Sequence, residues 1–140
     1  DEAAARRAAI AYCGHANALK PNLTALETLK LWAALYGAAE AAVASAVEDF
    51  DLAALKQRSA GMLSAGQRRR LGVSRLAVSS KPIWLLDEPT ASIDIRSAQR
   101  LSAIIAKHCQ RGGGAIIATH DRFELDGARR VSIENAAEAA

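Results

Sequence analysis

Four apolar residues in a row, Ile83 to Leu86, are followed at once by two carboxylates, Asp87 and Glu88. An uninterrupted apolar run of this length is typical of a strand buried on both faces of a sheet. Residues 115–119 form a second run of this kind, and the amphipathic pattern of residues 94–109 lies between the two. A strand, a helix and a strand joined by short connections predict parallel pairing with a right-handed crossover. We therefore expect an α/β fold with parallel core strands.

The two carboxylates are expected at the carboxyl edge of this sheet, where open parallel sheets bind ligands. Asp87 suits a magnesium ion, because Mg²⁺ prefers carboxylate, water and phosphate oxygens. Glu88 could then orient or deprotonate an attacking water. The alternative, a strand that ends in an ordinary acidic helix cap, stays open for these residues taken alone.

The composition fits one soluble domain of 140 residues, of which 51% are hydrophobic and 24% charged. The net charge is only +3 and aromatic residues make up 4%, so we expect no nucleic-acid partner. We expect Arg68–Arg70 to form a solvated helix face, and a salt bridge or a ligand contact by one of them is the alternative. Cys13 and Cys109 lack the spacing of a zinc site or a disulfide framework, which favours a reducing cytosol. No apolar run reaches the ~18 residues of a membrane span.

The remaining elements are predicted from apolar periodicity and breaker residues. Along the chain they are a strand at residues 7–13, a loop at 14–22, helices at 24–36, 39–50 and 64–78, a short turn near 52–55 and a candidate third strand at 130–133. Thr24 with Glu27 three residues on predicts a capping box, and Gly37 is expected to end that helix. We expect the alanine-rich residues 134–140 to be frayed.

Three short segments at element boundaries carry further polar groups. Ser64-Ala65-Gly66-Gln67 opens a helix, and the backbone N–H groups and dipole of a helix start make an anion site. Ala91-Ser92-Ile93-Asp94 begins the next helix. His120 follows the second apolar run, where it can donate a hydrogen bond to a phosphate oxygen. Taken singly, each segment is more simply explained as an ordinary helix cap, helix start or surface histidine.

In this order the segments resemble the ATP-binding subunits of ABC transporters. Residues 63–67 are similar to the signature motif, with Ala65 where glycine is usual. Residues 83–88 resemble Walker B with its catalytic glutamate. Residues 91–94 resemble the D-loop, and His120 resembles the switch histidine.

Upstream, Tyr12-Cys13-Gly14-His15 and the Leu-Thr-Ala-Leu-Glu of residues 23–27 look like the Q-loop region, with His15 where the family normally has glutamine. Together with Leu-Ser-Ala-Gly-Gln-x-Arg-Arg at residues 63–70, they resemble the haem-exporter ATPases of cytochrome c biogenesis. Another small ABC importer or exporter subunit is the alternative. The resemblance implies a P-loop NTPase fold with a helical subdomain, and a complete subunit that couples ATP hydrolysis to haem export.

The resemblance also implies a head-to-tail dimer with a second ATP-binding subunit, bound to transmembrane permease subunits on the cytoplasmic face of the cell membrane. The γ-phosphate of ATP held by the second subunit would be bound by Ser64, Ala65, Gly66 and Gln67. Asp87 would hold Mg²⁺, Glu88 would polarise the attacking water, and His120 would sense the γ-phosphate. Asp94 would couple the two sites, and His15 would stand near Mg²⁺ and the membrane partner.

No G-x-x-x-x-G-K-[S/T] phosphate-binding loop occurs in the 140 residues. We therefore expect a C-terminal fragment that forms a single partial ABC ATPase domain over residues 1–140, with the N-terminal lobe missing; a degenerate protein is the alternative. Residues 24–80 would form the helical subdomain with the signature motif, and residues 81–134 the part from Walker B to the switch histidine. Without the loop, we expect this chain alone to bind ATP at ~mM affinity or weaker and to be inactive.

Two rival functions stay open. One is a soluble ABC ATPase with no transport role, which co-purification with membranes would distinguish from a transporter subunit. The other is a non-catalytic interaction module built on the helical subdomain. An ATPase activity that does not change on Glu88→Gln in the complete subunit would favour it.

Overall fold

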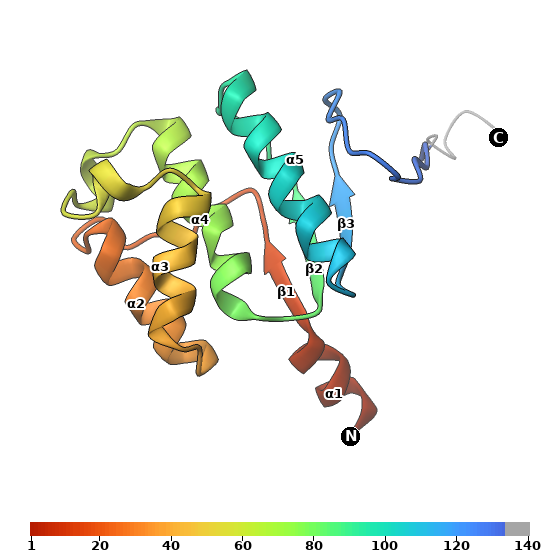
Figure 1. Ribbon diagram of the computed structural model, residues 1–140, viewed down its shortest axis with the longest axis horizontal. Helices are drawn as coiled ribbons and strands as arrows, with labels where there is room; N and C mark the ends of the chain where they lie inside the picture. The colour runs from red at the N-terminus through yellow and green to blue at the C-terminus, as the bar shows by residue number, and fades with distance from the viewer. Residues whose placement is uncertain (134–140) are drawn as a thin grey trace, which may run out of the picture.

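The structure is a computed structural model that describes residues 1–133. Its elements in chain order are α1 (Glu2–Ala9), β1 (Ile10–Cys13), α2 (Ala25–Tyr36), α3 (Glu40–Asp49), the 3-10 turns η1 (Ala53–Leu55) and η2 (Ala60–Met62), α4 (Ala65–Ser79), β2 (Ile83–Asp87), α5 (Ile95–Gln110) and β3 (Gly114–Ala118). Figure 1 shows α2, α3 and α4 grouped on one side of the strands, while α5 packs against β3. In the described part of the chain, no helix combines the length and the apolar character needed to cross a membrane.

The three strands form one parallel sheet in the order β1-β2-β3. β2 is the central strand, because Ile83 is in register with Ile10 on one side and with Gly114 on the other. The helix α5 connects β2 to β3, and α2, α3 and α4 lie between β1 and β2 in the chain. The predicted α/β class and parallel pairing are therefore confirmed. The division into residues 24–80 and 81–134 stays a prediction, since α4 packs on β1 as well as on α2 and α3.

The amino-terminal residues form a helix where the sequence predicts a strand. The strand expected at residues 7–13 begins only at Ile10, and residues 7–9 belong to α1. α1 is rich in alanine, the strongest helix former, and Asp1 caps it by accepting a hydrogen bond from Ala3 N at 3.1 Å. The β-branched Ile10 is the first residue of the segment with a clear strand preference. Local propensity therefore explains the correction.

The candidate strand at residues 130–133 is also wrong, because none of the described residues after β3 lies in a strand. Val131 is 69% exposed and Ile133 is 93% exposed. Two apolar residues that follow two arginines bury too little area to hold an edge strand in place. The tail expected to be frayed, residues 134–140, lies outside the described residues.

Only one face of the sheet is covered by described residues. Trp84 of β2 is buried, and its ring stacks on His108 of α5 with ring centroids 3.8 Å apart. On the opposite face the register places Tyr12, Leu85 and Ile116 side by side, and we refer to these three residues as the open sheet face. Tyr12 is 57% exposed and Ile116 is 66% exposed. The expectation of a strand buried on both faces is therefore wrong for β3, whereas Leu85 of the central strand is half-buried.

Two of the helices begin with a capping box. Ahead of α2, Thr24 Oγ1 accepts from Glu27 N at 3.1 Å, and Glu27 Oε2 accepts from Thr24 N at 2.8 Å, as predicted. Ahead of α4, Ser64 Oγ accepts from Gln67 N at 3.2 Å, and Gln67 Oε1 accepts from Ser64 N at 2.9 Å. The helix α2 ends, as expected, at Gly37 in the left-handed conformation with φ 66°. These local bonds fix where α2 and α4 start.

The helix α4 joins the helical group to the sheet. Leu71 and Leu76 are fully buried in the core that α4 shares with its neighbours. Fully burying a leucine contributes about 1.5–3 kcal/mol, so these two side chains anchor α4 firmly. The position of its amino end, which carries Ser64–Gln67, is thereby fixed relative to β1.

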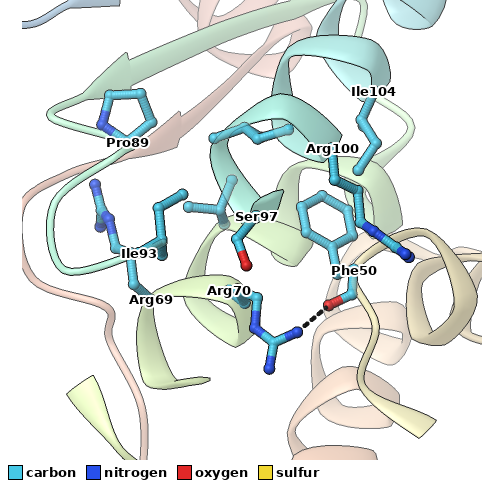
Figure 2. Close-up of a pocket in the computed structure, with 10 residues that line it drawn as sticks. Phe50, Arg69, Arg70, Pro89, Ile93, Ser97, Arg100 and Ile104 are labelled. Carbon is cyan, nitrogen blue, oxygen red and sulfur yellow. Dashed lines mark hydrogen bonds between the residues drawn. The ribbon is translucent and has the colours of Figure 1, made fainter. Parts of the chain in front are cut away.

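A small pocket marks the joint between α4, the end of α3 and the start of α5 (Figure 2). The residues that line it are Phe50, Arg69, Arg70, Val73, Pro89, Ile93, Ser97, Arg100, Leu101 and Ile104. The pocket has room for about one water molecule. Arg70 borders it and donates from Nη1 to Phe50 O at 3.4 Å and to Asp51 Oδ2 at 3.0 Å. This pocket is a small gap in the packing between helices, and it is too small for a nucleotide.

Candidate functional site

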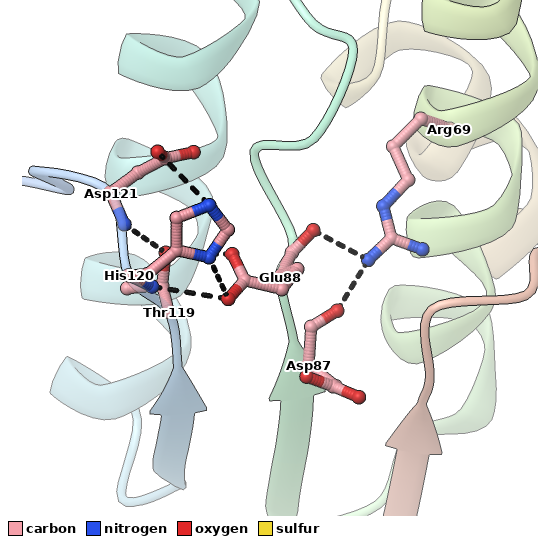
Figure 3. A network of polar contacts seen from close by, with 6 residues as sticks. All are labelled: Arg69, Asp87, Glu88, Thr119, His120 and Asp121. Carbon is pink, nitrogen blue, oxygen red and sulfur yellow. Dashed lines mark hydrogen bonds and ion pairs between the residues drawn. The ribbon is translucent and has the colours of Figure 1, made fainter.

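The carboxyl ends of the parallel strands meet at one edge of the sheet. Gly14 follows β1, Glu88 follows β2, and Thr119 and His120 follow β3. A hydrogen bond from Glu88 N to Ala118 O at 2.8 Å extends the pairing of β2 and β3 by one residue. Figure 3 shows that Glu88 and His120, which we predict as catalytic residues, face each other across this edge.

The Glu88 carboxylate is held by groups that follow the neighbouring strand. Thr119 Oγ1 donates to Oε2 at 3.1 Å, and His120 N donates to Oε1 at 3.1 Å. His120 Nδ1 lies 2.6 Å from Oε1. Thr119 is fixed in turn, because its Oγ1 accepts from Asp121 N at 3.1 Å. The orientation of the carboxylate is therefore set by β3 and the turn after it.

Glu88 and His120 shift each other's pKa in opposite directions. Desolvation raises the pKa of Glu88, but the hydrogen bonds from His120 and Thr119 outweigh it and lower that pKa below its ordinary value. The hydrogen bond and the charge of Glu88, together with the charge of Asp121, raise the pKa of His120. Both shifts favour the charged pair. A protonated His120 donates from both ring nitrogens, so Nε2, which lies 3.7 Å from Asp121 Oδ1, can bind a second acceptor while Nδ1 is bonded to Glu88.

The backbone at Glu88 is unusual. Its φ of 46° lies in the left-handed region, which is uncommon for a residue with a Cβ and costs of order 1–3 kcal/mol. Such a conformation persists only where the surroundings hold it. Arg69 Nη2 donates to the carbonyl oxygens of Asp87 at 2.6 Å and Glu88 at 2.8 Å. These two bonds flank the strained residue (Figure 3).

Asp87, the predicted metal ligand, stands apart from the Glu88 carboxylate. It is the last residue of β2 and is half-buried, and its carboxylate makes no hydrogen bond to a described residue. A half-buried carboxylate without a partner fits a magnesium ion, which binds through one or two carboxylates plus water and phosphate oxygens. A second set of possible ligands is Glu88, His120 and Asp121, whose ligand atoms lie within 4.8 Å of one another.

The predicted signature residues lie at the start of α4. Within the described residues, Ala65 N and Gly66 N make no hydrogen bond, because the capping box uses only the N–H groups of Ser64 and Gln67. Unpaired N–H groups at a helix start form an anion site. A Cβ atom on Gly66 would lie 2.7 Å from Ser92 O. The signature segment therefore packs directly on the segment that we predict as the D-loop.

Two other predicted site residues have local partners in the structure. Asp94 caps α5, because its Oδ1 accepts from Ser97 N at 2.7 Å, and this bond is the main reason that the pKa of Asp94 is lowered. The side chain of His15 is exposed, and its backbone oxygen lies 3.5 Å from Arg69 Nη1. The structure therefore brings His15 to the same edge of the sheet through its backbone. Its side chain makes no hydrogen bond to a described residue.

Arg69 corrects one expectation from the sequence. We expect Arg68–Arg70 to be a solvated face, yet Arg69 is 3% exposed. Its Nη1 donates to Gly14 O at 2.8 Å and to Asn17 Oδ1 at 3.0 Å. The periodicity of α4 carries the signal that could have found it. Position 69 shares one helical face with the buried residues Gly72, Val73 and Leu76.

Comparison with known proteins identifies the family of the chain. The family model described as "ABC transporter" matches residues 1–91. The chain belongs to the ABC transporter family. The predicted membership is therefore confirmed.

Curated relatives of this ABC chain have closely similar sequences. The "Cytochrome c biogenesis ATP-binding export protein CcmA" of Roseobacter denitrificans is 48% identical over 111 residues, and the protein of that name in Paracoccus denitrificans is 49% identical over 112 residues. These matches cover 79% and 80% of this chain, but 53% and 52% of the relatives. The predicted resemblance to the ATPases of cytochrome c biogenesis is confirmed. The chain spans about half the length of the curated relatives that it matches.

Solved structures support the ABC ATPase fold. The ATP-binding cassette MJ0796, a dimer in a post-hydrolysis state bound to ADP and Pi, has a TM-score of 0.74 and 25% identity. That match covers 84% of this chain and 54% of the cassette. An ATP-binding subunit of an ABC transporter has a TM-score of 0.75 and 24% identity, with 81% and 49% of the two chains covered. The predicted partial ABC ATPase fold is therefore confirmed.

Proposed function

We propose that this chain is the part of an ABC transporter ATP-binding subunit that carries the signature, Walker B, the D-loop and the switch histidine. The complete subunit hydrolyses ATP and couples this reaction to export, and the cargo is haem for cytochrome c biogenesis. The observation that carries the proposal is the Glu88 carboxylate held by Thr119 and His120 at the carboxyl edge of β2. The names and the 48–49% identity of the curated relatives support the cargo.

Asp87 is the residue of this chain that would hold Mg²⁺, which when bound neutralises charge on the phosphates of ATP. Glu88 orients the attacking water through its carboxylate. Its lowered pKa favours orientation and polarisation over full proton removal, because an efficient general base has a pKa near the working pH. His120 holds Glu88 through Nδ1 and donates from Nε2 to a γ-phosphate oxygen.

The start of α4 binds the nucleotide of a second subunit in a head-to-tail dimer. The donors are the unpaired N–H groups of Ala65 and Gly66 and the hydroxyl of Ser64, whose oxygen already accepts from Gln67 N. Gln67 keeps these donors in place through its bond to Ser64 N. Ser92 and Ile93, which lie against Gly66, lead into Asp94, and Asp94 links the dimer's two sites. His15 would stand near Mg²⁺ and the permease subunits.

In this proposal the complete subunit is a peripheral protein on the cytoplasmic face of the membrane, bound to permease subunits. The test is MgATP hydrolysis by the complete subunit, purified with its permease partners. Glu88→Gln is expected to lower kcat by about 10²–10⁴-fold, the usual contribution of a positioned acid–base group. Glu124→Gln is the matched control, because Glu124 is exposed and its carboxylate makes no hydrogen bond to a described residue.

Two outcomes would contradict the proposal. Unchanged hydrolysis in Glu88→Gln would remove Glu88 from the reaction and favour a non-catalytic module. If cells that lack the subunit still mature their c-type cytochromes, the cargo assignment fails, whatever the ATPase activity.

A further inference from the structure

Arg69 of α4 is a buried cation that bonds to two separate segments of the fold. The residue is 3% exposed. Nη1 donates to Gly14 O at 2.8 Å and to Asn17 Oδ1 at 3.0 Å, both in the segment after β1. Nη2 donates to Asp87 O at 2.6 Å and Glu88 O at 2.8 Å, at the end of β2.

The partners of Arg69 are four backbone carbonyl oxygens, the amide oxygen of Asn17 and the sulfur of Cys13, at 3.9 Å from Nη1. No carboxylate among the described residues forms an ion pair with it, and its Nε has no hydrogen-bond partner there. A buried charge is costly unless it is paired or fully hydrogen-bonded. An apolar side chain of similar length would fill the same space without that cost. The role of an arginine at this position must therefore come from the two segments that Nη1 and Nη2 bind.

The two bonds from Nη2 fall on either side of the residue with the strained backbone. Glu88 has φ 46°, and its own carbonyl oxygen also accepts from Ala91 N at 3.2 Å. The carboxylate of Glu88 is fixed by Thr119 and His120, but its backbone is fixed by Arg69. The position of the Glu88 carboxylate relative to an attacking water depends both on its side-chain hydrogen bonds and on the conformation of its backbone.

We propose that Arg69 is a positioning residue for the hydrolysis reaction. It holds the left-handed backbone of Glu88 and ties it to the loop that carries His15 and to the helix that carries the signature. The proposal rests on the function proposed above only in that Glu88 orients the attacking water. Lysine cannot replace arginine fully, because one ammonium lacks the planar fork that reaches both segments at once.

The experiment uses the complete subunit with Arg69→Met and Arg69→Lys, and with Arg111→Met as the matched control. Arg111 is exposed at the end of α5, far along the chain from the site. Three quantities are measured: kcat for MgATP, the amount of MgATP bound per subunit, and hydrogen–deuterium exchange of the nucleotide-free subunit. Bound MgATP per subunit separates a positioning role from loss of folded protein, which would lower binding and rate together.

For Arg69→Met we expect kcat to fall by about 10- to 100-fold, the cost of misplacing a catalytic group by about 1 Å. Bound MgATP per subunit should stay unchanged. Arg69→Lys should recover part of the rate. In Arg69→Met the amides of Glu88 and Ala91 should exchange at least about tenfold faster. The amides of α5, and every quantity in Arg111→Met, should match the wild type.

The outcomes separate the two proposals. If wild type and Arg69→Met hydrolyse ATP equally, the role of Arg69 is overturned and the ATPase function stands. If both Arg69 variants lose rate and MgATP binding in parallel, Arg69 is a structural residue and the positioning role is overturned. If the wild type does not hydrolyse ATP, the proposed function fails. The hydrogen–deuterium exchange of the Glu88 and Ala91 amides, compared between wild type and Arg69→Met, then still decides whether Arg69 holds this backbone.

Discussion

A Cβ atom on Gly66 would lie 2.7 Å from the carbonyl oxygen of Ser92, closer than real Cβ contacts allow. The start of α4 and the segment before α5 therefore meet backbone to backbone within one chain. A backbone oxygen cannot swing aside as a side chain can. Gly66 is consequently required by packing inside the subunit, separately from the phosphate contact proposed for it across a dimer.

Gly66→Ala should destabilise the protein even without nucleotide. Overpacking costs about 1–3 kcal/mol, while alanine regains up to ~1 kcal/mol of helix propensity. We expect a net loss of about 1–2 kcal/mol in the free energy of unfolding, measured by urea denaturation. Ala65→Ser, at the exposed neighbouring position, is the control and should stay within about 0.5 kcal/mol. An unchanged midpoint for Gly66→Ala would show that the two segments can separate freely.

The Glu88–His120 pair predicts a pH window. The pKa of His120 is raised above its ordinary 6.5, so the stabilisation is complete below pH 6.5 and is lost as the pH rises through the raised value. The pKa of Glu88 is lowered below its ordinary 4.5, so the pair is also lost as the pH falls through that lowered value. The pair is therefore intact from about pH 4.5 to 6.5 and somewhat beyond on both sides.

NMR titration of His120 in metal-free buffer measures this shift directly. Glu88→Gln should bring the pKa of His120 down toward its ordinary value, because it removes the charge of Glu88 and leaves His120 only a neutral, weaker hydrogen-bond acceptor. Asp121→Asn should lower it less, since Asp121 contributes only the third cause. A His120 pKa that is the same in wild type and Glu88→Gln would contradict the ion pair.

The stack of Trp84 on His108 should contribute measurably to stability. The rings are 9° from parallel with centroids 3.8 Å apart, and His108 Nε2 lies 3.1 Å from Pro82 O. Such ring pairs contribute about 0.5–1.5 kcal/mol beyond area burial, so His108→Ala should cost about 1 kcal/mol in urea denaturation. Lys107→Ala, one residue earlier and exposed, should cost nothing. Equal effects of the two substitutions would mean that the stack contributes no stability.

The open sheet face should make the isolated 140-residue chain self-associate. Tyr12, Leu85 and Ile116 lie side by side there, and exposed apolar patches promote association. Ile116→Thr should weaken association about tenfold in sedimentation equilibrium, as expected from the ~1.4 kcal/mol of apolar burial that is lost. Ile133→Thr is the matched control, because Ile133 is 93% exposed and lies outside the strands. A monomer at all concentrations would contradict the prediction.

The isolated chain should bind MgATP at ~mM affinity or weaker, because it lacks the glycine-rich loop and lysine that cradle the phosphates. Isothermal titration calorimetry measures this, with the complete subunit as the positive control. Micromolar binding by the isolated chain would show that the strand edge and the start of α4 hold nucleotide by themselves.

Features that depend on neighbours in the chain could be predicted from the sequence. The capping box of Thr24 and Glu27 and the left-handed Gly37 follow from residues within one helix. The parallel order of β2 and β3 follows from an apolar run, a helix and a second apolar run, because short connections leave few other ways to pair them. The site residues could be named in advance because their motifs, in this order along the chain, resemble those of ABC ATPases.

Features that depend on distant residues were decided only by the tertiary structure. Glu88 and His120 are 32 residues apart, and Arg69 and Gly14 are 55 apart. Sequence pattern alone therefore does not show that one carboxylate receives its donors from the next strand, or that one arginine of three is buried. The uncovered face of the sheet also depends on distant residues. An apolar run shows only that its residues prefer burial. Whether they are buried depends on which segments pack against them, and the free energy comes from those contacts.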